Sequence, residues 1–116
     1  MYMYRAIVTR VVDGDTLDLD VDLGFHVRKK IRCRLLDVDT PEIHKVKKES
    51  LEYKAGMRAK IFVEDWLKEN GNEVTISTEK GTGKYGRWLT LLWSDKALCL
   101  NEVLRKQDFY ATQEEI

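Results

Sequence analysis

Apolar residues gather in two short runs in the first part of the chain, and in the second run they alternate with polar residues. Two runs rich in β-branched and apolar residues, 6–12 and 17–23, meet at Asp13-Gly14, a dipeptide typical of tight hairpin turns. In the second run every other residue is leucine or valine, which gives one apolar and one polar face. The pattern predicts two antiparallel strands.

The polar face of the second run consists of three aspartates, Asp18, Asp20 and Asp22. Three carboxylates in a row suggest a metal site, but strict alternation with apolar residues is typical of a strand with one wet face. We therefore interpret them as a solvent-facing strip.

A third strand and a helix follow. Residues 25–38 keep the composition of a strand, and we expect it to end near Asp39 because Pro41 has no N–H to donate to a sheet. From Leu51 the apolar residues recur at intervals of three and four, which predicts an amphipathic helix that stops at Asn70-Gly71. Gly56 weakens this helix by about 1 kcal/mol relative to alanine.

The remaining elements complete the predicted fold. Residues 73–78 and 88–93 have the pattern of strands joined by a glycine-containing loop, and 101–107 is a short helical pattern that Asn101 is able to cap. Periodicity alone supports an α+β, mainly β protein. Five strands with a helix after the third resemble a five-stranded OB-fold-like barrel with an inserted helix and a short C-terminal helix.

Composition limits the possible functions only weakly. The 116 residues fit a single domain, 1–116, and 20 basic against 20 acidic residues give no net charge. A role in nucleic-acid binding would have to rest on local charge, such as the basic runs 28–34 and 44–48.

Cysteine usage and the absence of long apolar runs bear on the compartment. Cys33 and Cys99 do not make a disulfide framework, so we expect two free thiols. No run has the length of a signal peptide or of a membrane span. We expect a cytoplasmic protein from the chain as given, or a secreted one if the chain is a mature form, with no membrane association and a monomeric state.

Three separated motifs carry oxygen ligands and phosphate-matching cations. They are Asp13-Gly14-Asp15-Thr16, the stretch from Arg34 through Asp39-Thr40-Pro41 to Glu42, and Lys84-Tyr85-Gly86-Arg87. The carboxylates of Asp15 and Asp39 are hard ligands of the kind that Ca²⁺ prefers, and the Thr40 carbonyl is a further candidate because Pro41 keeps Thr40 extended. The guanidinium groups of Arg34 and Arg87 bind phosphate oxygens in pairs and stay protonated.

The order and wording of these motifs resemble the staphylococcal nuclease (SNase) family, over about residues 5–107. The resemblance implies an OB-type barrel and a Ca²⁺-dependent endonuclease that hydrolyses DNA and RNA, single-stranded or frayed, and leaves 3′-phosphate ends. It assigns Glu42 to orienting or deprotonating the attacking water, and adds Lys84 and Tyr85 as substrate contacts. Tyr85 is equally explained as a barrel aromatic.

Geometry poses one problem for this assignment. Residues 34 and 39 differ by an odd number, so on a straight strand they would face opposite sides, and their convergence requires a bend or bulge before Asp39. Asp13 is better suited to shaping the turn than to binding metal, and Thr16 to supporting the site. His26 and His44 lack partners at metal-ligand spacing, so we interpret both as surface residues.

Some positions depart from the family pattern. Asp37 adds a carboxylate where the family is usually apolar, and Gly83 replaces a common acidic residue. The C-terminal segment is short or truncated relative to the resembling nucleases, and only Tyr110 is a distant candidate for their base-stacking aromatics.

The competing hypothesis is a non-catalytic SNase-like module that binds nucleic acid or protein. Such relatives typically lose acidic or arginine site residues, whereas all five matching positions are retained here: Asp15, Arg34, Asp39, Glu42 and Arg87.

Overall fold

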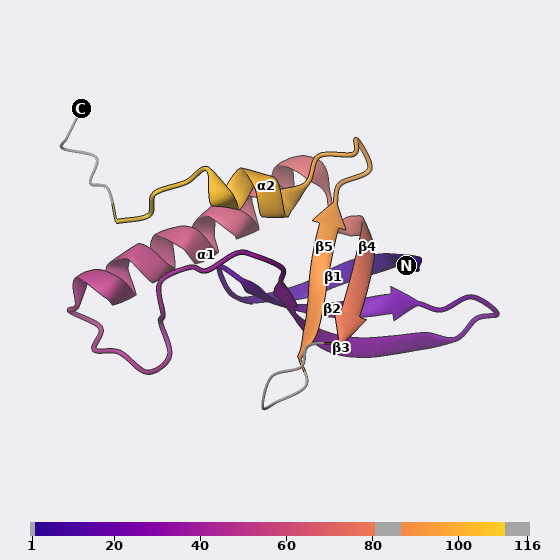
Figure 1. The fold of residues 1–116 in the computed structure, drawn as a ribbon, viewed down its shortest axis with the longest axis horizontal. Helices are drawn as coiled ribbons and strands as arrows, with labels where there is room; N and C mark the ends of the chain where they lie inside the picture. Colours follow the sequence, from indigo (N-terminus) through magenta and orange to yellow (C-terminus); the bar gives the residue numbers. More distant parts are fainter. Residues whose placement is uncertain (1, 81–86, 111–116) are drawn as a thin grey trace.

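The computed structural model describes residues 2–80 and 87–110, which form a β-barrel with two helices (Figure 1). The five strands close in the order β1-β2-β3-β5-β4. This confirms the predicted fold class. The elements in chain order are β1 (Met3–Asp13), β2 (Thr16–Asp22), β3 (Arg28–Leu35), α1 (Leu51–Asn70), β4 (Glu73–Lys80), β5 (Trp88–Trp93) and α2 (Leu100–Arg105).

Barrel closure depends on one parallel pairing. The other neighbours in the barrel are antiparallel, but β3 pairs with β5 in parallel, with Cys33 opposite Trp88 and Leu35 opposite Thr90. A parallel connection needs a crossover, and here the chain between β3 and β5 contains α1 and β4. The ends of β3 and β5 that carry predicted site residues are thereby brought side by side.

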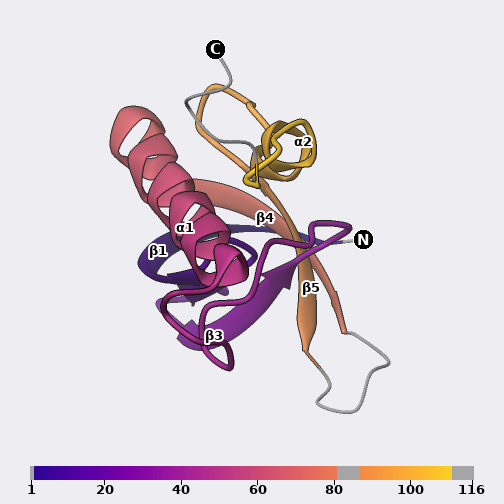
Figure 2. The same cartoon turned by 90° about the vertical axis from the view of Figure 1, so that its left-hand side faces the viewer.

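Alternating inward side chains of the strands fill the barrel, and α1 covers one end of it. Helix α2 lies beside β5, which it contacts, and α1 contacts β1 (Figures 1 and 2). Neither described helix combines the length and apolarity needed to cross a bilayer. The core joins residues from the strands and both helices, including Leu17, Leu19, Leu35, Val63, Trp66, Leu67, Val74, Ile76, Leu92 and Leu100.

The predicted bounds of the third strand are wrong at both ends. It begins at Arg28 because the hairpin tip is a turn, in which Phe25 and His26 have φ values of 57° and 63°. Leu23, expected on the apolar face, lies in this tip and is exposed. The strand ends at Leu35 because the chain turns at Asp37, which has a φ of 56°.

The three aspartates of β2 form a partly exposed strip, but they have partners that the pattern did not reveal. Asp18 accepts from Arg32 Nε at 2.7 Å and Nη2 at 3.1 Å, and Asp20 accepts from Arg28 Nε at 3.0 Å. These side chains are cross-strand neighbours of the β2–β3 ladder. The strip is therefore an ion-paired face of the barrel.

Asn101 does not cap the last helix as predicted. Cys99 precedes α2 without a capping side-chain hydrogen bond, and Asn101 is fully buried inside the helix. Its amide nitrogen donates to Leu36 O (3.0 Å) and Thr90 O (2.9 Å), while its oxygen accepts from Leu92 N at 3.0 Å. One side chain thus fastens α2 to β5 and to the segment that follows β3.

We expect Asn101→Ala to lower the free energy of unfolding by about 2–4 kcal/mol, because it leaves buried backbone groups without partners. Urea denaturation measures this loss. Glu102→Ala, at the next and exposed position of α2, is the matched control and should change stability little. An Asn101→Ala protein as stable as the parent would contradict the role given to this side chain.

Candidate functional site

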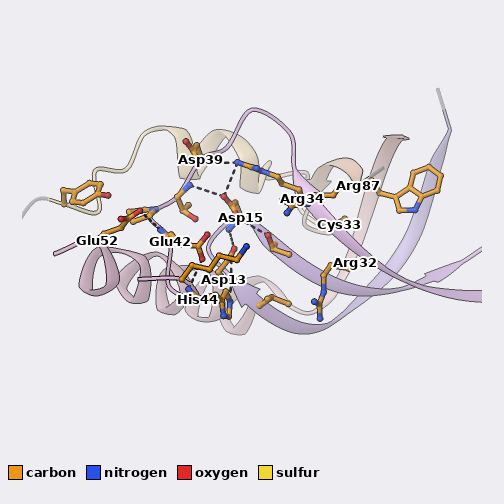
Figure 3. A pocket seen from close by; sticks show the side chains of 17 residues that line it. Asp13, Asp15, Arg32, Cys33, Arg34, Asp39, Glu42, His44, Glu52 and Arg87 are labelled. Carbon is orange, nitrogen blue, oxygen red and sulfur yellow. Dashed lines mark hydrogen bonds and ion pairs between the residues drawn. The ribbon is translucent and has the colours of Figure 1, made fainter. Parts of the chain in front are cut away.

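An open pocket of about 690 Å³ gathers residues from six parts of the chain (Figure 3). Its walls come from the β1–β2 turn, the end of β3, the segment after β3, the start of α1, the start of β5 and the segment after α2. Every described residue of the predicted site contributes to it: Asp15, Arg34, Asp39, Thr40, Glu42 and Arg87.

Arg34 joins the two predicted carboxylate ligands. Its Nη2 lies 3.3 Å from Asp39 Oδ1 and 3.6 Å from Asp15 Oδ2, although Asp15 and Asp39 come from different segments (Figure 3). The turn at Asp37 reverses the direction that a straight strand would impose, so the required bend is confirmed. Both acidic groups and one guanidinium therefore converge at one end of the pocket.

Asp15 is the buried member of this group. Its Oδ2 accepts from Thr40 N at 3.2 Å, and its Oδ1 accepts from Thr16 Oγ1 at 3.0 Å. Asp13 Oδ1 accepts from Asp15 N at 3.1 Å, which confirms that Asp13 shapes the turn. Burial, followed by the neighbouring Asp13 carboxyl, raises the pKa of Asp15 from 3.8 to about 6.

Glu42 is oriented by its own loop and by α1. Its Oε1 accepts from Ile43 N (3.0 Å) and His44 N (2.8 Å), and its backbone N–H donates to Glu52 Oε1 at 3.4 Å. Among the described residues these bonds use only Oε1, so Oε2 is available to a water. The carboxylate is partly buried at the pocket wall.

Gly56 explains how this loop lies so close to α1. A Cβ there would meet Ile43 Cγ2 and would approach Pro41 O to 2.6 Å and Glu42 O to 3.2 Å. The sequence marked Gly56 only as a weak point of the helix. The structure shows that its missing side chain makes room for the loop that carries Glu42.

Arg87 reaches the pocket from the start of β5. The pairing of Cys33 with Trp88 brings the start of β5 alongside β3, and Arg87 lines the wall shared with Arg32 and Arg34 (Figure 3). Lys84, Tyr85 and Gly83 lie outside the described residues, so the predictions made for them stay predictions.

Sequence reasoning missed several pocket residues. His44 is exposed, as predicted, but its half-exposed ring also lines the pocket, with Nε2 3.9 Å from Asp13 Oδ2. Its place two residues after Glu42 was the available signal. Lys45 and Glu52 also line the pocket.

Tyr110 lines the pocket as well, which the sequence suggested only distantly. The segment before it is fastened to α1, since Arg58 donates to Phe109 O through both Nε and Nη2. The rings of Phe62 and Phe109 also meet edge to face, with centroids 5.7 Å apart. These contacts hold Tyr110 at the edge of the pocket.

The cysteines take no part in the pocket chemistry. Both are free thiols, as expected. Cys33 is buried between Arg32 and Arg34, and burial raises the pKa of its thiol to about 11. A thiol with that pKa is a poor nucleophile at neutral pH.

The donor set suits a hard cation. Two carboxylates and the Thr40 carbonyl supply oxygen, the ligand type that Ca²⁺ takes, with six to eight ligands in all. Among the described residues no group of three or more His, Cys, Asp or Glu side chains is placed to hold a metal ion. A bound cation would therefore take its remaining ligands from water and a phosphate. Thr40 Oγ1, buried without a hydrogen-bond partner, marks a further polar atom in this segment.

Comparison with known proteins agrees with this geometry. The family model described as staphylococcal nuclease homologue matches residues 32–114. The chain belongs to this family. The resemblance based on the three motifs is thereby confirmed, and the protein is nuclease-like in sequence as well as in fold.

Three relatives show the extent of the similarity. The chain is 33% identical to protein ParB of Escherichia coli over 95 residues, covering 81% of this chain and 44% of ParB. It is 33% identical to a micrococcal nuclease of Shigella flexneri over 91 residues, 78% of this chain and 43% of that protein. Uncharacterized protein MJ1439 of Methanocaldococcus jannaschii is 32% identical over 125 residues, 91% of this chain and 58% of the relative. This SNase-family chain thus spans about half the length of these relatives.

The raised pKa of Asp15 predicts a pH-dependent effect of its removal. A carboxyl whose folded pKa exceeds its unfolded value stabilises the fold fully below about 3.8, and that contribution is lost as the pH rises through about 6. We expect metal-free Asp15→Asn to resist urea better than the parent above pH 6, by about 1 kcal/mol after allowance for solvent. The advantage should vanish as the pH falls toward 3.8. Asp65→Asn on the exposed face of α1 is the control, and a pH-independent gain would refute the explanation.

Gly56→Ala tests this role of Gly56, because helix propensity and packing predict changes of opposite sign in the free energy of unfolding. Helix propensity alone would stabilise the protein by about 1 kcal/mol, whereas contact with Pro41 O and Ile43 should destabilise it by a similar or larger amount. We expect a lower midpoint in urea and displacement of the Glu42 loop, visible as changed amide chemical shifts of residues 42–44. Glu69→Ala, at an exposed position of α1, separates propensity from packing.

Proposed function

We propose that this protein is a Ca²⁺-dependent nuclease that hydrolyses phosphodiester bonds of DNA and RNA with little sequence preference. The observation that carries the proposal is the convergence of Asp15 and Asp39 on Arg34, in one pocket with Glu42 and Arg87. Membership of the SNase family supports the same reaction class.

Phosphodiester hydrolysis needs an aimed water and compensation for the charge that the phosphoryl oxygens gain. Glu42 accepts a hydrogen bond from the water through the oxygen that its loop leaves available. Arg34 and Arg87 bind the phosphoryl oxygens from two walls of the pocket. Attack at phosphorus breaks the bond to the 5′ oxygen, which takes up a proton, and leaves a 3′-phosphate end.

Asp15, Asp39 and the Thr40 carbonyl would hold the Ca²⁺ ion. When bound, the ion supplies positive charge that the phosphoryl group needs as its negative charge grows. It would also replace the proton that Asp15 otherwise keeps up to about pH 6, the value to which burial and Asp13 raise its pKa. Without the ion, the single positive charge of Arg34 lies close to both carboxylates and offsets only part of their negative charge.

The substrate that fits is a single-stranded or frayed nucleic acid. The pocket is open and lined on its rim by Lys45, His44 and Tyr110, so a chain is able to cross it without threading. An exposed tyrosine ring offers a face on which any base is able to stack. Lys84 and Tyr85 remain predicted substrate contacts. The protein is taken to act as a monomer in a cytoplasmic or secreted setting.

We expect Arg34→Ala, Arg87→Ala and Glu42→Gln each to lower kcat by roughly 10²–10³, because each removes a group that acts on the developing charge or on the water. The assay is cleavage of a fluorescent single-stranded DNA with Ca²⁺, with Mg²⁺ and with a calcium chelator. Activity should require Ca²⁺.

The matched controls change an arginine and a glutamate that lie outside the pocket. Arg5→Ala removes an exposed arginine that pairs with Asp95 and Glu73, and Glu102→Gln alters an exposed carboxylate of α2, so both should leave kcat unchanged. Parent-like activity of Glu42→Gln or Arg87→Ala would end the assignment. Strong binding of DNA without cleavage under any condition would favour the non-catalytic module.

A further inference from the structure

The tip of the β2–β3 hairpin exposes apolar side chains that the barrel does not use. Phe25 is 99% exposed, and Leu23 and Val27 are 42% and 52% exposed. The turn is well formed, because Leu23 N donates to Val27 O and Val27 N donates to Gly24 O, each at 2.9 Å. The tip is therefore an ordered part of the fold that presents a phenyl ring to solvent.

The backbone of this turn is unusual for its sequence. Gly24, Phe25 and His26 all have positive φ, at 82°, 57° and 63°. The left-handed conformation costs a non-glycine residue roughly 1–2 kcal/mol, and a bulky phenylalanine is rarely found there. Since the Phe25 side chain is wholly exposed, no packing contact compensates for this cost. Strain of this kind is typical of segments that are kept for binding.

The hairpin is continuous with the candidate active site. By strand alternation, Arg28, Lys30, Arg32 and Arg34 point to the same side of β3, and the last two line the pocket. The distance from Arg28 to Arg34 along the strand is about 20 Å at ~3.3 Å per residue. Figure 1 shows the β2–β3 hairpin projecting from the barrel, and the other end of β3 carries Arg32 and Arg34, which line the pocket. These four cationic residues form a row that leads from the pocket to the hairpin tip.

Acidic residues on β2 moderate this row without cancelling it. Residues 16–34 carry five Lys or Arg against three Asp, within a chain of zero net charge. Arg28 pairs with Asp20 and Asp22 at 3.0 and 4.0 Å, and its side chain is 43% exposed. Exposed pairs of this kind contribute about 0–1 kcal/mol, so a phosphate is able to replace the carboxylate at little cost. Lys29 and Lys30 are exposed beside it.

We propose that the hairpin tip is a second contact for a single-stranded nucleic acid that extends from the pocket. Phe25 stacks on a base, and Arg28 and Lys30, on the same side of β3 as the two pocket arginines, contact neighbouring phosphates. The inference rests on the proposed function for its substrate class. It adds a site outside the pocket that makes binding depend on substrate length, because only a strand of several nucleotides spans both places; OB-type barrels cover about 4–16 nucleotides.

The test measures binding separately from cleavage. Fluorescence anisotropy with a chelator present gives the Kd for a labelled oligonucleotide of about 16 nucleotides and for a labelled dinucleotide. Phe25→Ala should raise the Kd of the long ligand roughly 5- to 100-fold, and leave the dinucleotide unaffected. Phe25→Trp should retain tight binding. Ile61→Ala, which removes an exposed apolar side chain of α1, is the matched control.

The outcomes separate this inference from the proposed function. Equal Kd values for parent and Phe25→Ala, or a parent that does not bind the long ligand, would overturn the hairpin contact even if cleavage is robust. Binding that depends on Phe25 in a protein that does not cleave would uphold the contact and reject the nuclease. If Phe25→Ala abolishes sedimentation with vesicles of anionic phospholipid but leaves DNA binding intact, the tip is a membrane contact instead and the proposal fails.

Discussion

The parallel pairing of β3 with β5 is the constraint on which the rest of the structure depends. It closes the barrel and places Cys33, Arg34 and Leu35 opposite Trp88, Leu89 and Thr90. Without it Arg34 and Arg87, which are far apart in the sequence, would have no common wall. Just beyond this pairing, Leu36 N donates to Thr90 O. The side-chain amide of Asn101 donates to Leu36 O and to Thr90 O.

The buried carboxylate of the pocket lowers the stability of the metal-free protein. Asp15 is buried beside Asp13, and that placement raises its pKa to about 6 because the charged form is poorly solvated. A cation bound in the pocket, as proposed, would relieve this cost and so couple ligand binding to folding through the same carboxylate. Sites that place like charges together are expected to be functional rather than stabilising.

Much of this architecture follows from local sequence rules. Apolar runs identified β1 and β2, and three- and four-residue periodicity identified α1 to its last residue. The motifs identified Asp15, Arg34, Asp39, Glu42 and Arg87. The local rules failed at residues whose role is set by a contact with a distant part of the sequence. Asn101 has the sequence signature of a cap, but its burial against β5 depends on tertiary packing. Gly56 similarly has a meaning only once the loop of Glu42 is placed against it. The approach of His44 and Tyr110 to the pocket likewise depends on how segments outside the strands fold back.

Cys33 gives the barrel a feature of a different kind. Its thiol lies inside the barrel, directly opposite Trp88 and between two arginines of the pocket wall. As long as β3 and β5 stay paired, burial keeps this sulfur from electrophiles and oxidants. The low reactivity of this thiol therefore depends on the closed barrel. The accessibility of this sulfur therefore depends on the pairing of β3 with β5, the same pairing that brings the two arginines together.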